Sequence, residues 1–167
     1  SRAREAGFTA FKVKVAFGLA GDLETVDAIN ADLRSGESLM VDANQGWNIE
    51  EARDAVASLS DREIGWIEEP IPADSSPEDW EELAMLSTSP LAGGENLSGF
   101  ASFADVIRRG HHQMIQPDLL KWGGVTGCHA VARQAIASGL IYCPHWLGSA
   151  VGLIASAQVL AAVGGEG

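Results

Sequence analysis

The chain has 167 residues, of which 46% are hydrophobic and 20% charged; it can bury the core of one domain, which excludes a disordered protein. Its 23 Asp and Glu residues against 11 Lys and Arg give a formal net charge of −12, which excludes binding to nucleic acids or anionic membranes through bulk charge. The chain has only two cysteines, it shows no signal-peptide pattern, and none of its apolar runs reaches the roughly 20 residues that span a bilayer. We therefore expect a cytoplasmic protein.

Short β-rich runs alternate along the chain with stretches in which apolar residues recur at helical spacing. The predicted strands span 11–15, 39–41, 66–67, 91–92, 114–115 and 141–143. The predicted helices span 21–33, 48–59, 77–86, 125–138 and 152–163. For the third helix, Ser76 is the predicted N-cap and Pro77 the first helical residue. The alternation of strand and helix predicts a parallel α/β fold.

Each predicted strand ends in polar side chains that are costly to bury. They are Lys12 and Lys14, Asp42, Glu68 with Glu69, Glu95, Asp118 and His145. From Lys14 onwards the intervals are 28, 26, 27, 23 and 27 residues, about the length of one strand–helix unit of a (β/α)8 barrel, whose strand ends converge on one site. A doubly wound sheet usually has a Gly-rich first turn, and the chain has no G-x-G-x-x-G motif. We predict a (β/α)8 TIM-type barrel with about six units in the chain, one strand being expected before Ser1 and one after Gly167.

Asp42, Glu68 and Glu95 end three successive predicted strands at similar spacing. Three converging carboxylates repel one another unless a cation lies between them, and hard oxygen ligands select Mg²⁺, Ca²⁺ or Mn²⁺. Because Mg²⁺ leaves room for substrate oxygens, we predict a Mg²⁺ site. The alternative is that these residues cap helices or pair with Lys and Arg, which does not require a regular spacing. Glu68 and Glu69 are adjacent, so only one of the two faces the mouth of the barrel.

Lys12 and Lys14 are two residues apart and share one face of a strand. Their like charges, and a nearby metal, are expected to lower the pKa of both lysines, so that one can act as a base near neutral pH. The alternative is a solvated edge strand that carries two lysines. Against it, Val13 and Val15 alternate onto the other face, where the helices of a barrel would cover them.

Asp118 and His145 end neighbouring predicted strands. A carboxylate beside an imidazole fixes the tautomer of the ring and raises its basicity, as in a catalytic dyad. The alternative is a histidine of the core and an aspartate of a turn. Cys143 and His145 also form a C-x-H pair, but no second pair of soft ligands accompanies them, so we do not predict zinc.

Six motifs in this order resemble the enolase superfamily and, within it, the mandelate racemase group. They are K-V-K from Lys12, VDANQGW from Val41, IEEP from Ile67, GGEN from Gly93, QPDLLKWGGVTG from Gln116 and PHW from Pro144. The resemblance extends over nearly the whole chain. It implies a catalytic barrel domain over residues 1–167, without the N-terminal α+β capping domain and the terminal barrel strands of the family.

The resemblance also implies a role for each strand end. Asp42, Glu68 and Glu95 would hold Mg²⁺, Lys14 would be one acid/base catalyst, and Lys12 would lie beside the substrate carboxylate. The family carries an acidic residue after its last barrel strand, and the sequence stops before that position. Glu166 is near the terminus but does not stand where that residue would, so it is not assigned this role.

On the opposite face of the substrate, His145 would be the second catalyst, oriented by Asp118. The muconate-cycloisomerase group has a lysine where Asp118 stands, which makes that group the poorer match. Asn44 would contact the substrate, with Glu69 and Asn96 in supporting positions.

The reaction that the resemblance implies is removal of the proton α to a carboxylate. Dehydration of an acid sugar, in which His145 helps to expel a β-hydroxyl, is favoured because most members with this layout resemble acid-sugar dehydratases. The alternatives are racemisation or epimerisation of a 2-hydroxy acid, and a catalytically inactive barrel fragment. The expected partner is a small-molecule carboxylate, and the whole protein is expected to be a homo-oligomer.

Overall fold

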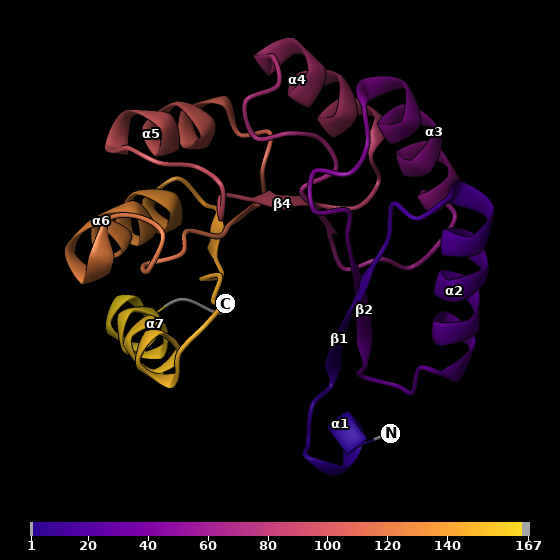
Figure 1. Ribbon diagram of the computed structural model, residues 1–167, viewed down its shortest axis with the longest axis horizontal. Coiled ribbons are helices and arrows are strands. Elements are labelled where there is room, and N and C mark those ends of the chain that lie inside the picture. The colour runs from indigo at the N-terminus through magenta and orange to yellow at the C-terminus, as the bar shows by residue number, and fades with distance from the viewer. Residues whose placement is uncertain (1, 165–167) are drawn as a thin grey trace. The chain divides into compact units, whose positions relative to one another are not determined.

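A computed structural model describes residues 2–164, in which strands and helices alternate (Figure 1). The strands are β1 (Ala10–Lys14), β2 (Ser38–Asp42), β3 (Ile67–Glu68), β4 (Leu91–Gly93), β5 (Met114–Ile115) and β6 (Ile141–Tyr142). The helices are α1 (Arg2–Glu5), α2 (Leu19–Asp32), α3 (Ile49–Leu59), α4 (Pro77–Leu86), α5 (Phe100–Arg109), α6 (Gly124–Ala137) and α7 (Ala150–Val163). The predicted parallel α/β organisation is confirmed, whereas α1 and α5 were not predicted. Glu166 lies outside the described residues.

The chain divides into two compact units, unit 1 (Ser1–Leu91) and unit 2 (Ala92–Gly167). In unit 1, β1 pairs with β2 and β2 with β3, all parallel. The register places Lys14 opposite Asp42, and Asp42 opposite Glu68. Three of the polar residues that were predicted at strand ends therefore lie in one row at the C-terminal edge of these strands.

The core of unit 1 forms because apolar residues alternate along β1 and recur at helical spacing in α2. Val13 and Val15 pack into the same apolar cluster as Leu23 and Val26, as expected for a strand covered by helices on one face. Figure 1 shows α2 and α3 alongside one another. A capping box at Asn48 starts α3, and the predicted Ser76 cap with Pro77 starts α4.

In unit 2, β4 pairs with β5 and β5 with β6, again parallel, and an isolated parallel bridge continues the last pairing from Asp118 to His145. The unpredicted helix α5 packs through Phe103 and Ile107, which are four residues apart. Gly110, with a left-handed backbone (φ 73°), caps its C-terminus. The apolar spacing of α5 is the sequence signal that would have predicted it. Across residues 2–164, none of the helices combines the length and the apolar character needed to cross a membrane.

Candidate active site

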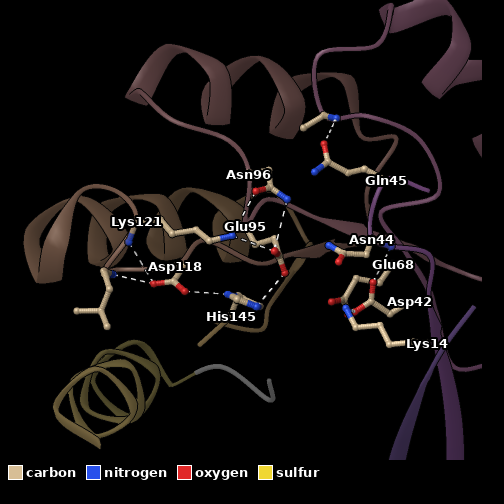
Figure 2. Close-up of polar contacts among 12 residues, drawn as sticks. Lys14, Asp42, Asn44, Gln45, Glu68, Glu95, Asn96, Asp118, Lys121 and His145 are labelled. Carbon is tan, nitrogen blue, oxygen red and sulfur yellow. Dashed lines mark hydrogen bonds and ion pairs between the residues drawn. The ribbon is translucent and has the colours of Figure 1, made fainter. Parts of the chain in front are cut away.

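Two lysines and two carboxylates form a cluster at the C-terminal edge of unit 1. Lys14 Nζ lies 2.7 Å from Oδ2 of Asp42, and Lys12 Nζ lies 3.1 Å from the same oxygen. Lys12 also donates a short hydrogen bond to Oε1 of Glu68. Both ammonium groups thus bind carboxylates, although β1 is the first strand in the sheet order and the side chain of Lys14 is half exposed, as in the alternative of a solvated edge strand. Figure 2 shows Lys14 beside Asp42 and Glu68.

The two carboxylates of this cluster are buried, whereas the lysines remain accessible. The side chain of Asp42 is 2% exposed and that of Glu68 is 1% exposed, against 53% for Lys14. A buried carboxylate requires a nearby cation, because water cannot compensate its charge there. Burial alone would raise the pKa of Asp42, but the ammonium groups of Lys14 and Lys12 outweigh it and lower that pKa.

One expectation for the lysines is wrong. Burial does lower the pKa of Lys12, but its hydrogen bond to Glu68 and the charges of Glu68 and Asp42 outweigh burial, so the pKa is raised. Lys12 is therefore a fixed cation rather than a base. This role fits a group that binds a carboxylate.

The loops that follow β2 and β3 contain left-handed backbone outside glycine, at Asn44 (φ 48°), Gln45 (φ 61°) and Glu69 (φ 42°). The N–H of Asn44 donates to Oδ1 of Asp42 at 2.9 Å, which fixes the Asp42 carboxylate. The N–H of Gln45 donates to the Glu69 carbonyl at 2.7 Å, and its side-chain oxygen accepts from the Ala73 N–H at 2.8 Å. Such strained positions persist only where contacts hold them, and they concentrate at functional sites.

The predicted dyad is present in unit 2 (Figure 2). Nδ1 of His145 lies 2.8 Å from Oδ2 of Asp118, and Oδ1 of Asp118 accepts from the Leu120 N–H at 2.7 Å. The other ring nitrogen, Nε2, lies 2.9 Å from Oε2 of Glu95. His145 thus lies between two carboxylates, of which only Asp118 was predicted as its partner.

Glu95 is held by two cationic partners. Lys121 Nζ lies 2.9 Å from Oε1 of Glu95 and 3.2 Å from Oδ1 of Asn96. Burial would raise the pKa of Glu95, but His145 and Lys121 lower it to about 2. Conversely, burial would lower the pKa of His145, and Glu95 and Asp118 together raise it. A raised pKa keeps the proton on His145 to a higher pH than on a free imidazole, which suits a general acid.

Lys121 was missed by the sequence prediction, although a signal was available. The chain contains only three lysines, Lys12, Lys14 and Lys121, and every other basic side chain apart from histidine is an arginine. All three lysines bind carboxylates at the C-terminal ends of strands. In this chain, the positions of the lysines therefore indicate the candidate site.

The oxygen ligands of unit 1 fit a hard divalent cation. Oε1 of Glu68 and Oδ2 of Asp42 both bind the Lys12 ammonium, so these two buried oxygens already converge on one positive charge. Among residues 2–164, no three or more His, Cys, Asp and Glu side chains are grouped so that they could hold a metal ion. The Mg²⁺ site with Asp42, Glu68 and Glu95 as ligands therefore stays a prediction.

Comparison with known proteins relates the whole chain to one family. Residues 1–167 match the family described as enolase C-terminal domain-like. The chain is 32% identical to the D-galactarolactone cycloisomerase of Agrobacterium fabrum over 96% of its own length and 42% of that protein. The chain thus spans less than half the length of this curated relative.

Two solved structures share the fold. One is a mandelate racemase/muconate lactonizing enzyme from Bordetella bronchiseptica, with 46% identity and a TM-score of 0.93 over 98% of this chain and 46% of that chain. The other is an L-talarate dehydratase from Polaromonas with Mg and L-glucarate, with 33% identity and a TM-score of 0.81 over 87% of this chain and 41% of that chain. The α/β fold is therefore that of the enolase superfamily barrels. The chain belongs to the enolase superfamily, with the mandelate racemase and muconate lactonizing enzymes among its relatives.

Proposed function

We propose that the protein is an acid-sugar dehydratase that removes the proton α to a carboxylate and expels the β-hydroxyl, with Mg²⁺ as its cofactor. The observation that carries this proposal is the contact of 2.8 Å between Nδ1 of His145 and Oδ2 of Asp118. Expulsion of a hydroxyl requires a proton donor, because hydroxide is a poor leaving group. The L-talarate dehydratase with bound Mg and L-glucarate supports both the reaction and the cofactor.

The residues of unit 1 would act on the acid end of the substrate. Lys12, a fixed cation, would bind the carboxylate, and the half-exposed Lys14 would take the α-proton. Asp42, Glu68 and Glu95 would hold Mg²⁺, which supplies positive charge that stabilises the doubly negative form of the substrate carboxylate. Asn44, beside Asp42, is a further candidate for a substrate contact.

The residues of unit 2 would complete the elimination. The electron pair left by the α-proton forms the double bond between the α and β carbons, while His145 gives its proton to the departing β-hydroxyl, which leaves as water. Asp118 holds Nδ1 of the ring, so the proton at Nε2 is the one that is delivered. The product carries the 2-hydroxyl group on this double bond, so it is the enol of a 2-keto acid and tautomerises to that keto acid. Overall, each substrate molecule loses one molecule of water.

Racemisation or epimerisation of a 2-hydroxy acid is the second candidate. A proton on His145 that could be given to a departing hydroxyl could equally be returned to the α-carbon. The product distinguishes the two reactions, because racemisation conserves the composition of the substrate whereas dehydration removes water.

The test is an assay of the protein at its full natural length with Mg²⁺ and a panel of sugar acids. We expect a 2-keto acid to form, detected as its semicarbazone, and the α-proton to exchange with D₂O, detected by NMR. Both signals should disappear when EDTA removes the metal. Exchange with inversion and without a keto acid would favour racemisation, and the absence of Mg²⁺-dependent exchange for every acid would reject the proposal.

A further inference from the structure

Glu68 has a second hydrogen-bond donor that the sequence did not suggest. Nε1 of the Trp66 indole lies 3.0 Å from Oε2 of Glu68. Lys12 binds the other carboxylate oxygen, Oε1. The two oxygens therefore differ in their partners, since one accepts from a neutral N–H and the other from a cation.

The backbone fixes this contact. Trp66 precedes β3 directly, and residues two apart on a strand point to the same face, so its indole lies on the side of Glu68. The Val41 N–H donates to the Trp66 carbonyl at 3.1 Å, and the Ala43 N–H donates to the Glu68 carbonyl at 2.9 Å. Both residues are thus held against β2 at the same edge. The rigid indole has two side-chain torsions, whereas Lys12 has a flexible stem.

The cationic side of Glu68 faces Asp42. Lys12 Nζ binds Oε1 of Glu68 and lies 3.1 Å from Oδ2 of Asp42, so Oε1 is the Glu68 oxygen directed at the neighbouring carboxylate. Lys12 binds Oε1 in this structure, and its ammonium group would turn to the substrate carboxylate, the role proposed for it above, when Mg²⁺ binds Oε1. A neutral donor on Oε2 stops the carboxylate from rotating without adding a second positive charge. Hydrogen bonds of this kind orient metal ligands in many proteins.

We propose that Trp66 is a positioning residue, whose indole N–H holds Oε2 of Glu68 so that Oε1, on the side of Asp42, is the oxygen that binds Mg²⁺. This inference rests on the proposed function, because it requires a metal at Glu68. It goes beyond that function by assigning the two Glu68 oxygens different roles and by adding a neutral residue to the site.

The test replaces the donor and keeps the ring. In the full-length protein, Trp66→Phe removes the indole N–H and leaves Lys12 and both carboxylates in place. We expect the Kd for Mn²⁺, measured from free Mn²⁺ by electron paramagnetic resonance, to rise about tenfold. Mg²⁺ should compete with Mn²⁺ in the wild type, and circular dichroism should show that the variant is folded.

Trp80→Phe is the matched control, because it also removes an indole N–H, from a tryptophan that is buried in α4 within the core of unit 1. Its Mn²⁺ affinity should stay within about twofold of the wild type. Labelling with 5-fluorotryptophan adds a direct signal: the ¹⁹F resonance that is missing from Trp66→Phe should shift when Mg²⁺ binds to the wild type.

The outcomes separate this inference from the proposed function. If the wild type bound Mn²⁺ but Trp66→Phe bound it equally well, or if Trp80→Phe lost as much affinity, the role of Trp66 would be rejected and the proposed function would stand. If the wild type bound no Mn²⁺ in competition with Mg²⁺, both would be rejected. A tenfold loss confined to Trp66→Phe, with a Mg²⁺-dependent shift of its resonance, would establish the role.

Discussion

The two units balance the negative charge at their strand ends in different ways. In unit 1, Asp42 and Glu68 are paired with the ammonium groups of Lys12 and Lys14, and the two carboxylates raise the pKa of Lys12. In unit 2, Glu95 is shared between Lys121 and His145, and His145 is also bound by Asp118. Unit 2 therefore contains an imidazole between carboxylates, and these carboxylates raise its pKa.

This difference suggests that the two units have different roles in the proposed reaction. The cluster with the Lys12 cation suits binding of a carboxylate, whereas the cluster with an imidazole between carboxylates suits delivery of a proton. Both kinds of cluster follow the same rule, since buried carboxylates need cationic partners. They differ in the type of partner, which is lysine alone in unit 1 and includes histidine in unit 2. The predictions below test that difference, beginning with the largest expected effect.

Removal of the proton-transfer groups should have the largest effect. In the full-length protein, His145→Ala and Lys14→Ala should each lower the kcat of dehydration by about 10³-fold, because each removes one proton-transfer group. One of the two variants is expected to retain α-proton exchange with D₂O, since a base would remain on one face. Steady-state kinetics and NMR measure the two quantities.

Arg53→Ala is the control for these variants. Arg53 binds Glu82 between α3 and α4 and has no contact with the clusters among the hydrogen bonds and ion pairs described for it. Its kcat should match that of the wild type. Wild-type rates in both His145→Ala and Lys14→Ala would show that the two catalysts are assigned wrongly.

Asp118→Asn tests the dyad with a smaller change. Asparagine keeps an oxygen that can accept from the Leu120 N–H, at 2.7 Å in the wild type, but it removes the charge that faces Nδ1 of His145. We expect kcat to fall about 10²-fold, less than for loss of the imidazole, because Glu95 still contacts the ring. Asp105→Asn, on the exposed face of α5, should leave kcat unchanged. Equal kcat values for the two variants would exclude Asp118 from the dyad.

The sequence could predict which polar side chains lie at the ends of the strands, because these residues recur at nearly constant intervals. Parallel strands that follow one another at intervals of 23 to 28 residues bring their C-terminal ends to one edge, and the register places Lys14, Asp42 and Glu68 opposite one another within unit 1. The same argument predicted the Asp118–His145 contact within unit 2. Here backbone periodicity alone decides which side chains meet.

The partners of these residues could not be predicted in the same way. Trp66 and Lys121 reach their carboxylates through side-chain rotamers, and a repeat of strand ends does not specify them. The pKa of Lys12 was predicted in the wrong direction because the prediction considered Lys14, its neighbour on the same strand, and a nearby metal, but not the carboxylates. The carboxylates of Asp42 and Glu68 come from other strands and have the larger effect.

The pKa values of two histidines in unit 2 show that burial and nearby carboxylates shift the pKa of an imidazole in opposite directions. The pKa of His145 is raised by its two carboxylates, whereas burial and the charge of His111 lower that of His112 to about 4. Between pH 4 and the unfolded value of 6.5, the unfolded chain binds a proton that folded His112 does not, so stability falls as the pH falls through this window.

At pH 5, His112 should therefore cost about 2 kcal/mol of the unfolding free energy that the protein has at pH 7. His112→Gln removes the titrating group and should remove this part of the pH dependence. Urea unfolding of both proteins at pH 5 and pH 7 measures the difference. If the two proteins lost the same free energy between these pH values, His112 would not be the buried group responsible.

The smallest expected effect concerns how the helices of the two units begin. In unit 1, the side chain of Asn48 accepts from the Glu51 N–H at 3.0 Å, and the Glu51 carboxylate accepts from the Asn48 N–H at 3.0 Å. In unit 2, α5 follows Gly99 and has no side-chain cap. Asn48→Ala should lower the unfolding free energy by about 1 kcal/mol, whereas Asn48→Asp, which keeps the acceptor, should lower it less. Urea unfolding at pH 7 measures both, and equal losses would show that the side-chain oxygen does not stabilise the start of α3.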